Sequence, residues 1–237
     1  ISIATVMLPK LSDYFNRSNI DAYNRTLNWG LKLGILISFP TMFGLIILSD
    51  PILITLLKYK EFTLNDVHMT SIALIAFSIG LPGMIGSKIL ITNYYSRKDT
   101  KYPVKAALIA VLCNFVLNIA FVVYLVKTDF NGAHIGLAVA TSLSAYVNFF
   151  FLFKNAVKTK IFNMDQDIVF YILKSVIATI VMSAFLLYFD LSKQAWMDYE
   201  LLERVMNLFL LIIFSALIYF AFLYLFNIKP KNIKEQL

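Results

Sequence analysis

Composition places this chain outside the soluble protein classes. It has 237 residues, 59% of them hydrophobic and 15% charged, with a formal charge of +7 and a mean hydropathy of +0.74. A soluble domain carries about 25% charged residues and about 45–50% apolar residues, so an ordinary cytosolic enzyme, a disordered tail and a disulfide scaffold are excluded. The single cysteine, Cys113, can form no disulfide within the chain. The composition predicts an all-α polytopic membrane protein.

The chain opens inside an apolar run that ends at Leu8. Because it begins with Ile1 rather than Met, we expect a fragment of a longer protein, starting at the end of a helix. A short amphipathic helix is expected over residues 20–29, after a weak capping box of Ser18 and Asp21. Six later stretches approach or exceed the roughly 20 mostly apolar residues that cross a bilayer. They are residues 31–49, 69–95, 104–126, 135–153, 168–189 and 205–226.

Proline and glycine predict irregular points within two of these spans. Pro40 and Pro82 lie inside spans and should kink them, because proline removes a helical hydrogen bond. Gly80, Gly83 and Gly86 surround Pro82. They follow no strand and lie at membrane depth, so they predict a hinge and not a phosphate-binding loop.

The positive charges alternate between the two sides of the predicted spans. One side contains Lys10, Arg17, Arg25, Lys32, Arg97, Lys98, Lys101, Lys105, Lys154, Lys158, Lys160, Lys229, Lys231 and Lys234. The other side contains only Lys58, Lys60, Lys127, Lys193 and Arg204. Cytoplasmic loops carry the excess of Lys and Arg, so the sequence predicts a cytoplasmic C-terminus. The charge is spread over several loops, which argues against a nucleic-acid partner.

Few polar side chains fall at membrane depth. Lys88 lies about seven residues from the end of the second span, where it either snorkels to the headgroups or faces a water-filled cavity that holds an anionic substrate. Asn114 and Asn118 are four residues apart, hence on one helix face, and serve either as contacts between helices or as substrate contacts. Lys174 is near a span end and is expected to snorkel.

Two further features favour a transporter over an enzyme. The fourth span places small or polar residues at every fourth position, which is typical of close helix packing: Gly136, Ala140, Ser144 and Asn148. No nucleophile–base pair, paired carboxylates or acidic metal cluster occurs at membrane depth, so no catalytic residue, metal or cofactor is predicted. His68 and His134 begin spans without a second ligand at metal spacing.

Four segments resemble the MurJ/MviN lipid II flippases, a family of the multidrug/oligosaccharidyl-lipid/polysaccharide exporter superfamily. In chain order they are IATVMLPKLS, NRTLNWGLKLGILISFP, KILITNYYSRKDTKYPVK and HIGLAVATSLSAYVN. The resemblance runs from Ile3 to about Asn148, and the last two spans match the family's final helices in number and position. Positions that match family patterns are residues 5–9, Lys88, Tyr95, Pro103 and Gly136.

The resemblance implies the C-terminal half of a fourteen-helix, two-lobe transporter in the bacterial inner membrane. Residues 1–160 would form the C-terminal lobe, from the end of helix 8 to helix 12, and residues 161–237 would form helices 13 and 14 with a cytoplasmic tail. The family moves the undecaprenyl-diphosphate-linked peptidoglycan precursor to the outer leaflet by alternating access. The partners implied are lipid II, membrane lipids and the missing N-terminal lobe, whose cavity arginines this sequence lacks.

The resemblance also frames the candidate site. Thr5, Lys88, Asn114 and Asn118 are the candidate substrate contacts, and Leu211, Ala216 and Ser183 are the candidates for a groove that takes the polyprenyl tail. Three alternatives stay open at this point. They are a flippase for another polyprenyl-linked oligosaccharide, such as an O-antigen or capsule unit, an intramembrane polyprenyl-phosphate enzyme, and a structural subunit without transport.

Overall fold

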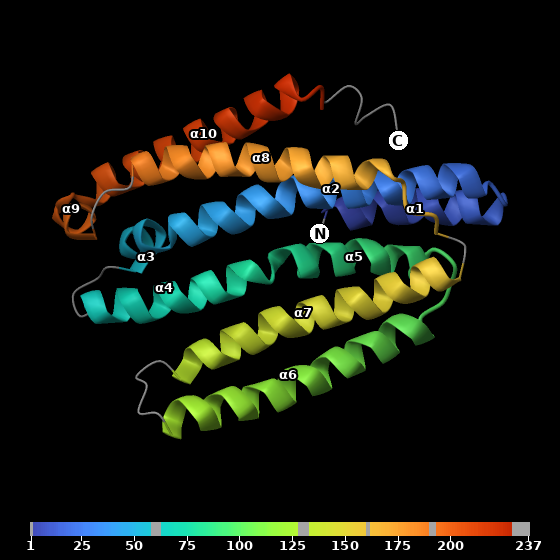
Figure 1. Cartoon of the computed structure of the whole chain (residues 1–237), viewed down its shortest axis with the longest axis horizontal. Helices are drawn as coiled ribbons and strands as arrows, with labels where there is room; N and C mark the ends of the chain where they lie inside the picture. Colours follow the sequence, from blue (N-terminus) through green and yellow to red (C-terminus); the bar gives the residue numbers. More distant parts are fainter. Residues whose placement is uncertain (1, 58–62, 128–132, 160–161, 190–192, 229–237) are drawn as a thin grey trace.

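The computed structural model of the chain describes residues 2–57, 63–127, 133–159, 162–189 and 193–228. These residues form helices and short connections (Figure 1). The helices are α1 (Ser2–Asn16), α2 (Ile20–Ile47), α3 (Ser49–Leu57), α4 (Leu64–Ile79), α5 (Leu81–Tyr95), α6 (Lys101–Lys127), α7 (Ala133–Lys158), α8 (Asp167–Tyr188), α9 (Lys193–Asp198) and α10 (Leu201–Leu225).

The six predicted spans are confirmed as helices. α2, the α4–α5 pair, α6, α7, α8 and α10 are each long and apolar enough to cross a membrane. The leading helix extends further than the sequence predicted, since α1 continues through Pro9 to Asn16. Met7 and Leu11 explain the extension, because they lie one turn apart and are both fully buried in the core. Their burial outweighs the one hydrogen bond that proline removes.

The separate helix predicted over residues 20–29 is wrong. α2 is one continuous helix from Ile20 to Ile47, and its first half is buried as deeply as a span, with Tyr23 and Leu27 fully inaccessible. The predicted cap is also displaced by one residue. The side chain of Asn19 accepts the hydrogen bond of the Ala22 N–H at 3.1 Å, whereas Ser18 adopts a positive φ of 55° in the turn before the helix.

The predicted hinge in the second span is a real break. α4 ends at Ile79, Gly80 lies between the helices, and Pro82 stands in the first turn of α5, where its missing N–H costs little. Gly80 also allows close contact with α7. A Cβ at Gly80 would come within 2.8 Å of the Ser142 Cα, which is closer than atoms can pack. The glycine is therefore required by the approach of α7 to the break.

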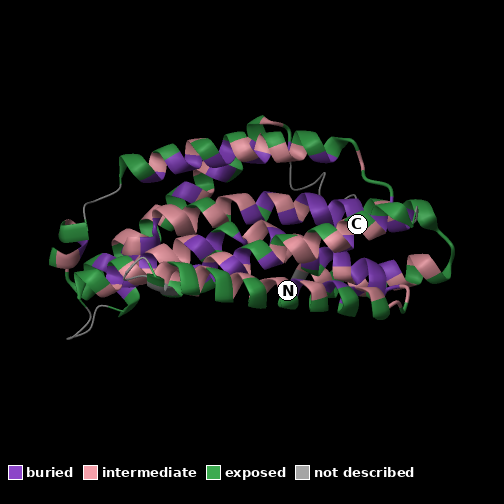
Figure 2. Ribbon diagram, turned by 60° about the horizontal axis from the view of Figure 1, so that its bottom comes forward, coloured by how far each residue is buried: buried purple, intermediate pink, exposed green. Residues whose placement is uncertain are grey.

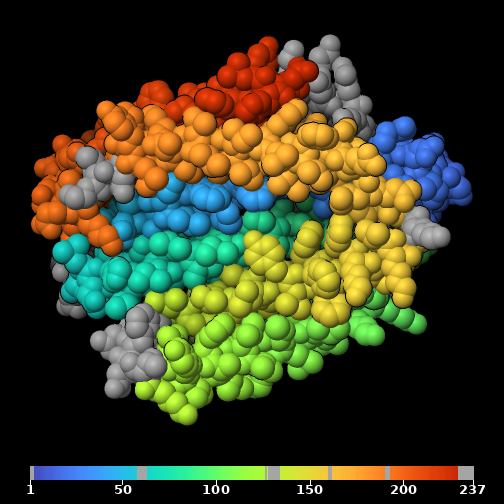
Figure 3. All heavy atoms as spheres, viewed as in Figure 1, coloured from blue at the N-terminus to red at the C-terminus, as the bar shows by residue number. Residues whose placement is uncertain are grey.

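The helices form a layered bundle with α2 near its centre. α8 and α10 cover one side of α2, and α4 with α5 covers the other, followed by α7 and then α6 (Figures 1 and 3). The largest buried cluster joins α1, α2, α5 and α7, and a second joins α2, α8 and α10. Buried residues form stripes on the inward faces of helices whose other faces are exposed (Figure 2). The exposed faces are rich in large apolar side chains, as expected of surfaces that meet lipid.

The small-residue face of the fourth span packs on α6. A Cβ at Gly136 would lie 2.8 Å from the Phe121 Cβ, and Ser144 accepts a hydrogen bond from Asn114 at 3.3 Å. Ala140 is fully buried. The predicted packing role of this face is confirmed for these residues.

The structure also groups the loops that the charge count assigned to one side. α2, α6 and α8 begin, and α5 and α7 end, at the same end of the bundle, on the right of Figure 1. Six of the counted lysines lie outside the described residues: Lys58, Lys60, Lys160, Lys229, Lys231 and Lys234. The side of the membrane that each end faces stays a prediction.

Candidate functional site

An apolar groove lies between the second half of α2 and α10, and we call it the α2–α10 groove. Its volume is about 330 Å³. It is lined at every fourth position by Leu36, Pro40 and Gly44 of α2 and by Leu48 at the end of that helix, and α10 contributes Ala216 among others. Residues four apart share one face of a helix. The groove is therefore a strip of apolar surface along α2, walled by the last helix of the bundle.

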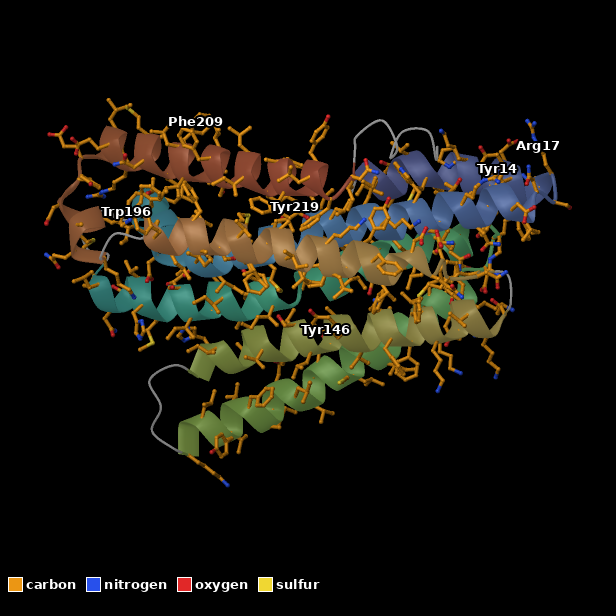
Figure 4. All side chains as sticks on the ribbon, turned by 45° about the horizontal axis from the view of Figure 1, so that its top comes forward. Tyr14, Arg17, Tyr146, Trp196, Phe209 and Tyr219 are labelled. Atoms are coloured by element: carbon orange, nitrogen blue, oxygen red, sulfur yellow. The ribbon has the colours of Figure 1, made fainter. Side chains whose placement is uncertain are left out.

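Tyr219 joins three helices beside this groove. Pro40 has no N–H, so the carbonyl of Leu36, four residues earlier, lacks its usual helical donor. The Tyr219 hydroxyl donates a hydrogen bond to that carbonyl at 2.8 Å, and the Ser175 hydroxyl of α8 lies 2.9 Å from the Tyr219 hydroxyl oxygen. Tyr219 lies on α10, and its side chain is buried against the neighbouring helices (Figure 4). The proline within α2 thus leaves the carbonyl at which α10 attaches.

The three predicted groove residues do not share one site. Ala216 lines the α2–α10 groove, whereas Leu211 lines a second apolar hollow of about 400 Å³ beside Trp196 of α9 and Asn207. Ser183 lines neither of these two hollows. It is buried on α8, and its hydroxyl has no hydrogen-bond partner among the described residues. Of the three, Ala216 marks the groove that runs along α2.

Lys88 and Thr5 both lie on exposed faces. Lys88 is exposed on α5, and Thr5 is exposed on α1, which packs against α5. The flanking residues Ser87 and Ile89 are buried, so α5 directs the lysine away from the core. The structure thus places Lys88 where it is free to reach either an aqueous path or the headgroup region.

Asn114 and Asn118 connect α6 with α7. The Asn114 amide donates to the hydroxyls of Thr141 and Ser144, each at 3.3 Å, and accepts from the Asn118 amide at 2.9 Å. A hollow of about 360 Å³ beside Asn114 is also lined by Asn148. These bonds support the interpretation that the two asparagines are contacts between helices. The hollow beside them is a partly polar surface at membrane depth.

The first half of α2 carries a polar set that was not predicted from the sequence. Asn24, Asn28 and Lys32 stand four residues apart and bind the described part of the connection between α7 and α8, residues 162–166. Lys32 had been counted as a loop charge, but its side chain is only 7% exposed. The sequence does contain the pattern, a polar residue at every fourth position. The prediction of two separate helices within α2 concealed it.

Lys32 and Asp165 form the charged part of this set. The Lys32 ammonium lies 2.6 Å from the Asp165 carboxylate and 5.0 Å from the centre of the Tyr171 ring, a cation–π distance. The hydrogen bond from Lys32 holds the pKa of the Asp165 carboxyl below its usual value, while partial burial acts in the opposite direction. No group of three or more His, Cys, Asp or Glu side chains in the described part of the chain could hold a metal ion.

Comparison with known proteins gives a consistent result. A family model described as "Lipid II flippase MurJ" matches residues 1–207. The chain is 33% identical to the probable lipid II flippase MurJ of Vibrio cholerae, over 99% of this chain and 43% of that protein, and 31% identical to that of Haemophilus influenzae, over 98% and 45%.

A solved structure agrees with these sequence matches. It is titled lipid II flippase MurJ, inward closed conformation, and it aligns with a TM-score of 0.73 and 30% identity, over 95% of this chain and 42% of that one. The chain therefore spans a little under half the length of these curated relatives. The family match extends past the segments that carry the resemblance, through all of α8 and into α10. The chain belongs to the lipid II flippase MurJ family.

Proposed function

We propose that this chain is the C-terminal part of a lipid II flippase and supplies the groove that guides the polyprenyl tail of the cargo. The α2–α10 groove is the observation that carries this proposal. The groove is almost wholly apolar, and it lies between two helices that are each long enough to span a membrane. A relative named probable lipid II flippase MurJ matches 99% of the chain, including both helices that form the groove.

The groove has a guiding role in this proposal. Lipid tails are as apolar as leucine side chains, so moving a tail from bilayer into groove yields little hydrophobic free energy. What the groove offers is shape, because its floor is an α2 strip that includes Gly44, where no atom lies within 4 Å of a Cβ position. A tail held there would keep the polar part of the cargo near the bundle while the lobes move.

Lys88 is our first candidate for contact with the anionic part of the cargo. It lies seven residues before the end of α5, roughly 10 Å along the helix at 1.5 Å per residue. A lysine at such depth on an exposed face is stable next to water or an anion but costly in lipid. Thr5 is proposed to border the same path. Asn114 and Asn118 come second, because their amides are already used between α6 and α7.

The remaining assignments follow from the family. We place the protein in the bacterial inner membrane with the basic end of the bundle in the cytoplasm, and we assign transport rather than catalysis. Residues 1–160 are proposed as the end of helix 8 and helices 9–12 of the C-terminal lobe, and residues 161–237 as helices 13 and 14 with the tail. The cationic cavity is proposed to be completed by the lobe that precedes this sequence.

Complementation tests the proposal. The full-length gene should restore growth and precursor flipping in bacteria depleted of their own lipid II flippase, and Ala216→Phe, which fills the groove, should impair both. Leu217→Phe is the matched control, since Leu217 is 59% exposed and lies outside the groove. Rescue of an O-antigen or capsule flippase mutant, without rescue of peptidoglycan precursor flipping, would overturn the assignment to lipid II. Equal activity of both phenylalanine variants would overturn the groove.

A further inference from the structure

We propose that Asn24, Asn28 and Lys32 are positioning residues that clamp the α7–α8 connection to α2. The clamp makes α8 and α10 move as one body with the helices that precede them. This goes beyond the proposed function and depends on it in one respect only, namely that the moving body carries the α2–α10 groove.

Four hydrogen bonds form the clamp. The side-chain amide oxygen of Asn24 accepts from the Asn163 N–H at 2.9 Å, and the side-chain amide of Asn28 donates to the Asn163 backbone carbonyl at 2.9 Å. The Asn28 oxygen accepts from the Asp165 N–H at 3.0 Å, and Lys32 donates to the Asp165 carboxylate at 2.6 Å. Asn24 and Asn28 thus satisfy backbone groups of an irregular segment as a neighbouring strand would, and Lys32 on the same helix face holds its carboxylate.

The clamped connection separates two hollows of opposite character. Asn163 and Asp165 border a polar hollow of about 460 Å³, together with the clamp residues and Arg25. Met164, between them in sequence, borders an apolar hollow of about 270 Å³ that is walled by α2, α5, α7 and α8. The connection therefore presents polar residues to one side and an apolar residue to the other. Release of the clamp would join the two hollows and admit water beside the core.

Two other contacts attach the α8–α10 segment to the rest of the bundle. Near the middle of the bundle, Tyr219 holds α10 to the Leu36 carbonyl. At the far end, the Lys193 ammonium of α9 lies 2.8 Å from the Asp50 carboxylate of α3. The clamp is the third attachment, and it lies at the point where the chain passes from α7 to α8. With all three attachments in place, α8 is held along its length and does not move separately from α2.

Distance measurements on the full-length protein in lipid nanodiscs test this directly. Spin labels at Leu143→Cys on α7 and Ile180→Cys on α8, in a Cys113→Ser background, report the separation of the two helices, and both labelled positions are exposed. We expect one narrow distance distribution in the unmodified clamp, and a wider distribution with a second, longer population after Asn28→Ala. Arg25→Gln is the matched control, because Arg25 borders the same polar hollow outside the four bonds.

Further variants keep the test decisive if Asn28→Ala does not fold. Asp165→Asn removes the charge of a side chain that is 38% exposed, so folding should survive, and it should widen the distribution. Asp165→Glu keeps the carboxylate and should leave the distribution narrow. Identical distributions in Asn28→Ala, Asp165→Asn and the unmodified protein would overturn the clamp. A full-length protein that fails to flip lipid II, yet loses its narrow distribution in these variants, would overturn the proposed function and leave the clamp standing.

Discussion

Replacement of the Tyr219 hydroxyl offers a quantitative test of how α10 is attached. Tyr219→Phe removes a donor to the Leu36 carbonyl, which lacks its usual helical donor because Pro40 has no N–H. An unsatisfied buried carbonyl costs about 1–3 kcal/mol, while single hydrogen bonds in bilayers average about 0.6 kcal/mol and reach about 1.7 kcal/mol. We therefore expect the free energy of unfolding to fall by about 1–2 kcal/mol.

The proline supplies the decisive comparison. Pro40→Ala restores a backbone N–H to the helix, and that N–H can donate to the Leu36 carbonyl. In this background Tyr219→Phe leaves no orphaned carbonyl, so its cost should fall below about 0.6 kcal/mol. The two substitutions should thus be strongly non-additive, with a coupling energy of about 1 kcal/mol.

Equilibrium unfolding of the full-length protein in mixed micelles measures all four members of this cycle. Tyr188→Phe is the control, because Tyr188 is 83% exposed and removal of its hydroxyl should change the free energy of unfolding by less than about 0.5 kcal/mol. If Tyr219→Phe lowers the free energy of unfolding equally with proline and with alanine at position 40, the Leu36 carbonyl is not the reason that α10 attaches there.

Three other predictions concern packing, charge and pH. Gly80→Ala should lower the free energy of unfolding by about 1–3 kcal/mol, because the new methyl meets the α7 backbone, whereas Gly44→Ala, with open space around it, should change it by less than about 1 kcal/mol in the same micelle assay. Lys88→Ala should lower the rate of lipid II flipping in vesicles at least about tenfold, as expected for loss of a charge-assisted hydrogen bond of about 1.5–3 kcal/mol. Lys174→Ala is the control and should retain activity. Equal activities of the two variants would show that Lys88 only snorkels to the headgroups. Because the pKa of Asp165 is lowered in the folded state, its ion pair stabilises the protein above the unfolded pKa of about 3.9 and is lost as pH falls through the lower folded value. Proteolysis of the α7–α8 connection should therefore increase below about pH 4, and Asp165→Asn should abolish that dependence.

The sequence predicted the features that depend on local composition. Spans such as 168–189 were found because length and hydropathy are fixed by bilayer thickness, whatever the neighbours. The break at Gly80 was found because glycine and proline act on their own backbone. The packing face at Gly136 was found because helical periodicity places every fourth residue together.

The sequence could not predict the features that depend on partners distant in the chain. Nothing near Lys32 indicates that its partner is Asp165, which lies 133 residues later, and a basic residue near a span end is usually a topology signal. The family resemblance assigned Ser183 and Leu211 to one groove with Ala216. Which face of each helix borders the α2–α10 groove depends on the rotation of α8, set by packing on α2 and α10, and on that of α10, set by packing on α8 and α3. Such rotations are properties of the assembled bundle.

The spacing of α2 explains how one helix serves both the clamp and the groove. Residues four apart advance 400°, so each step of the series that begins at Asn24 and continues through Lys32 and Leu36 to Gly44 shifts about 40° around the axis. The first members meet the α7–α8 connection, and the later members border the groove beside α10. The change from polar to apolar side chains falls between Lys32 and Leu36, where α2 passes from the basic end of the bundle towards membrane depth. A tail guided along the later members would therefore lie on the same helix that the clamp holds in place, so loosening the clamp should disturb the groove without altering any residue that lines it.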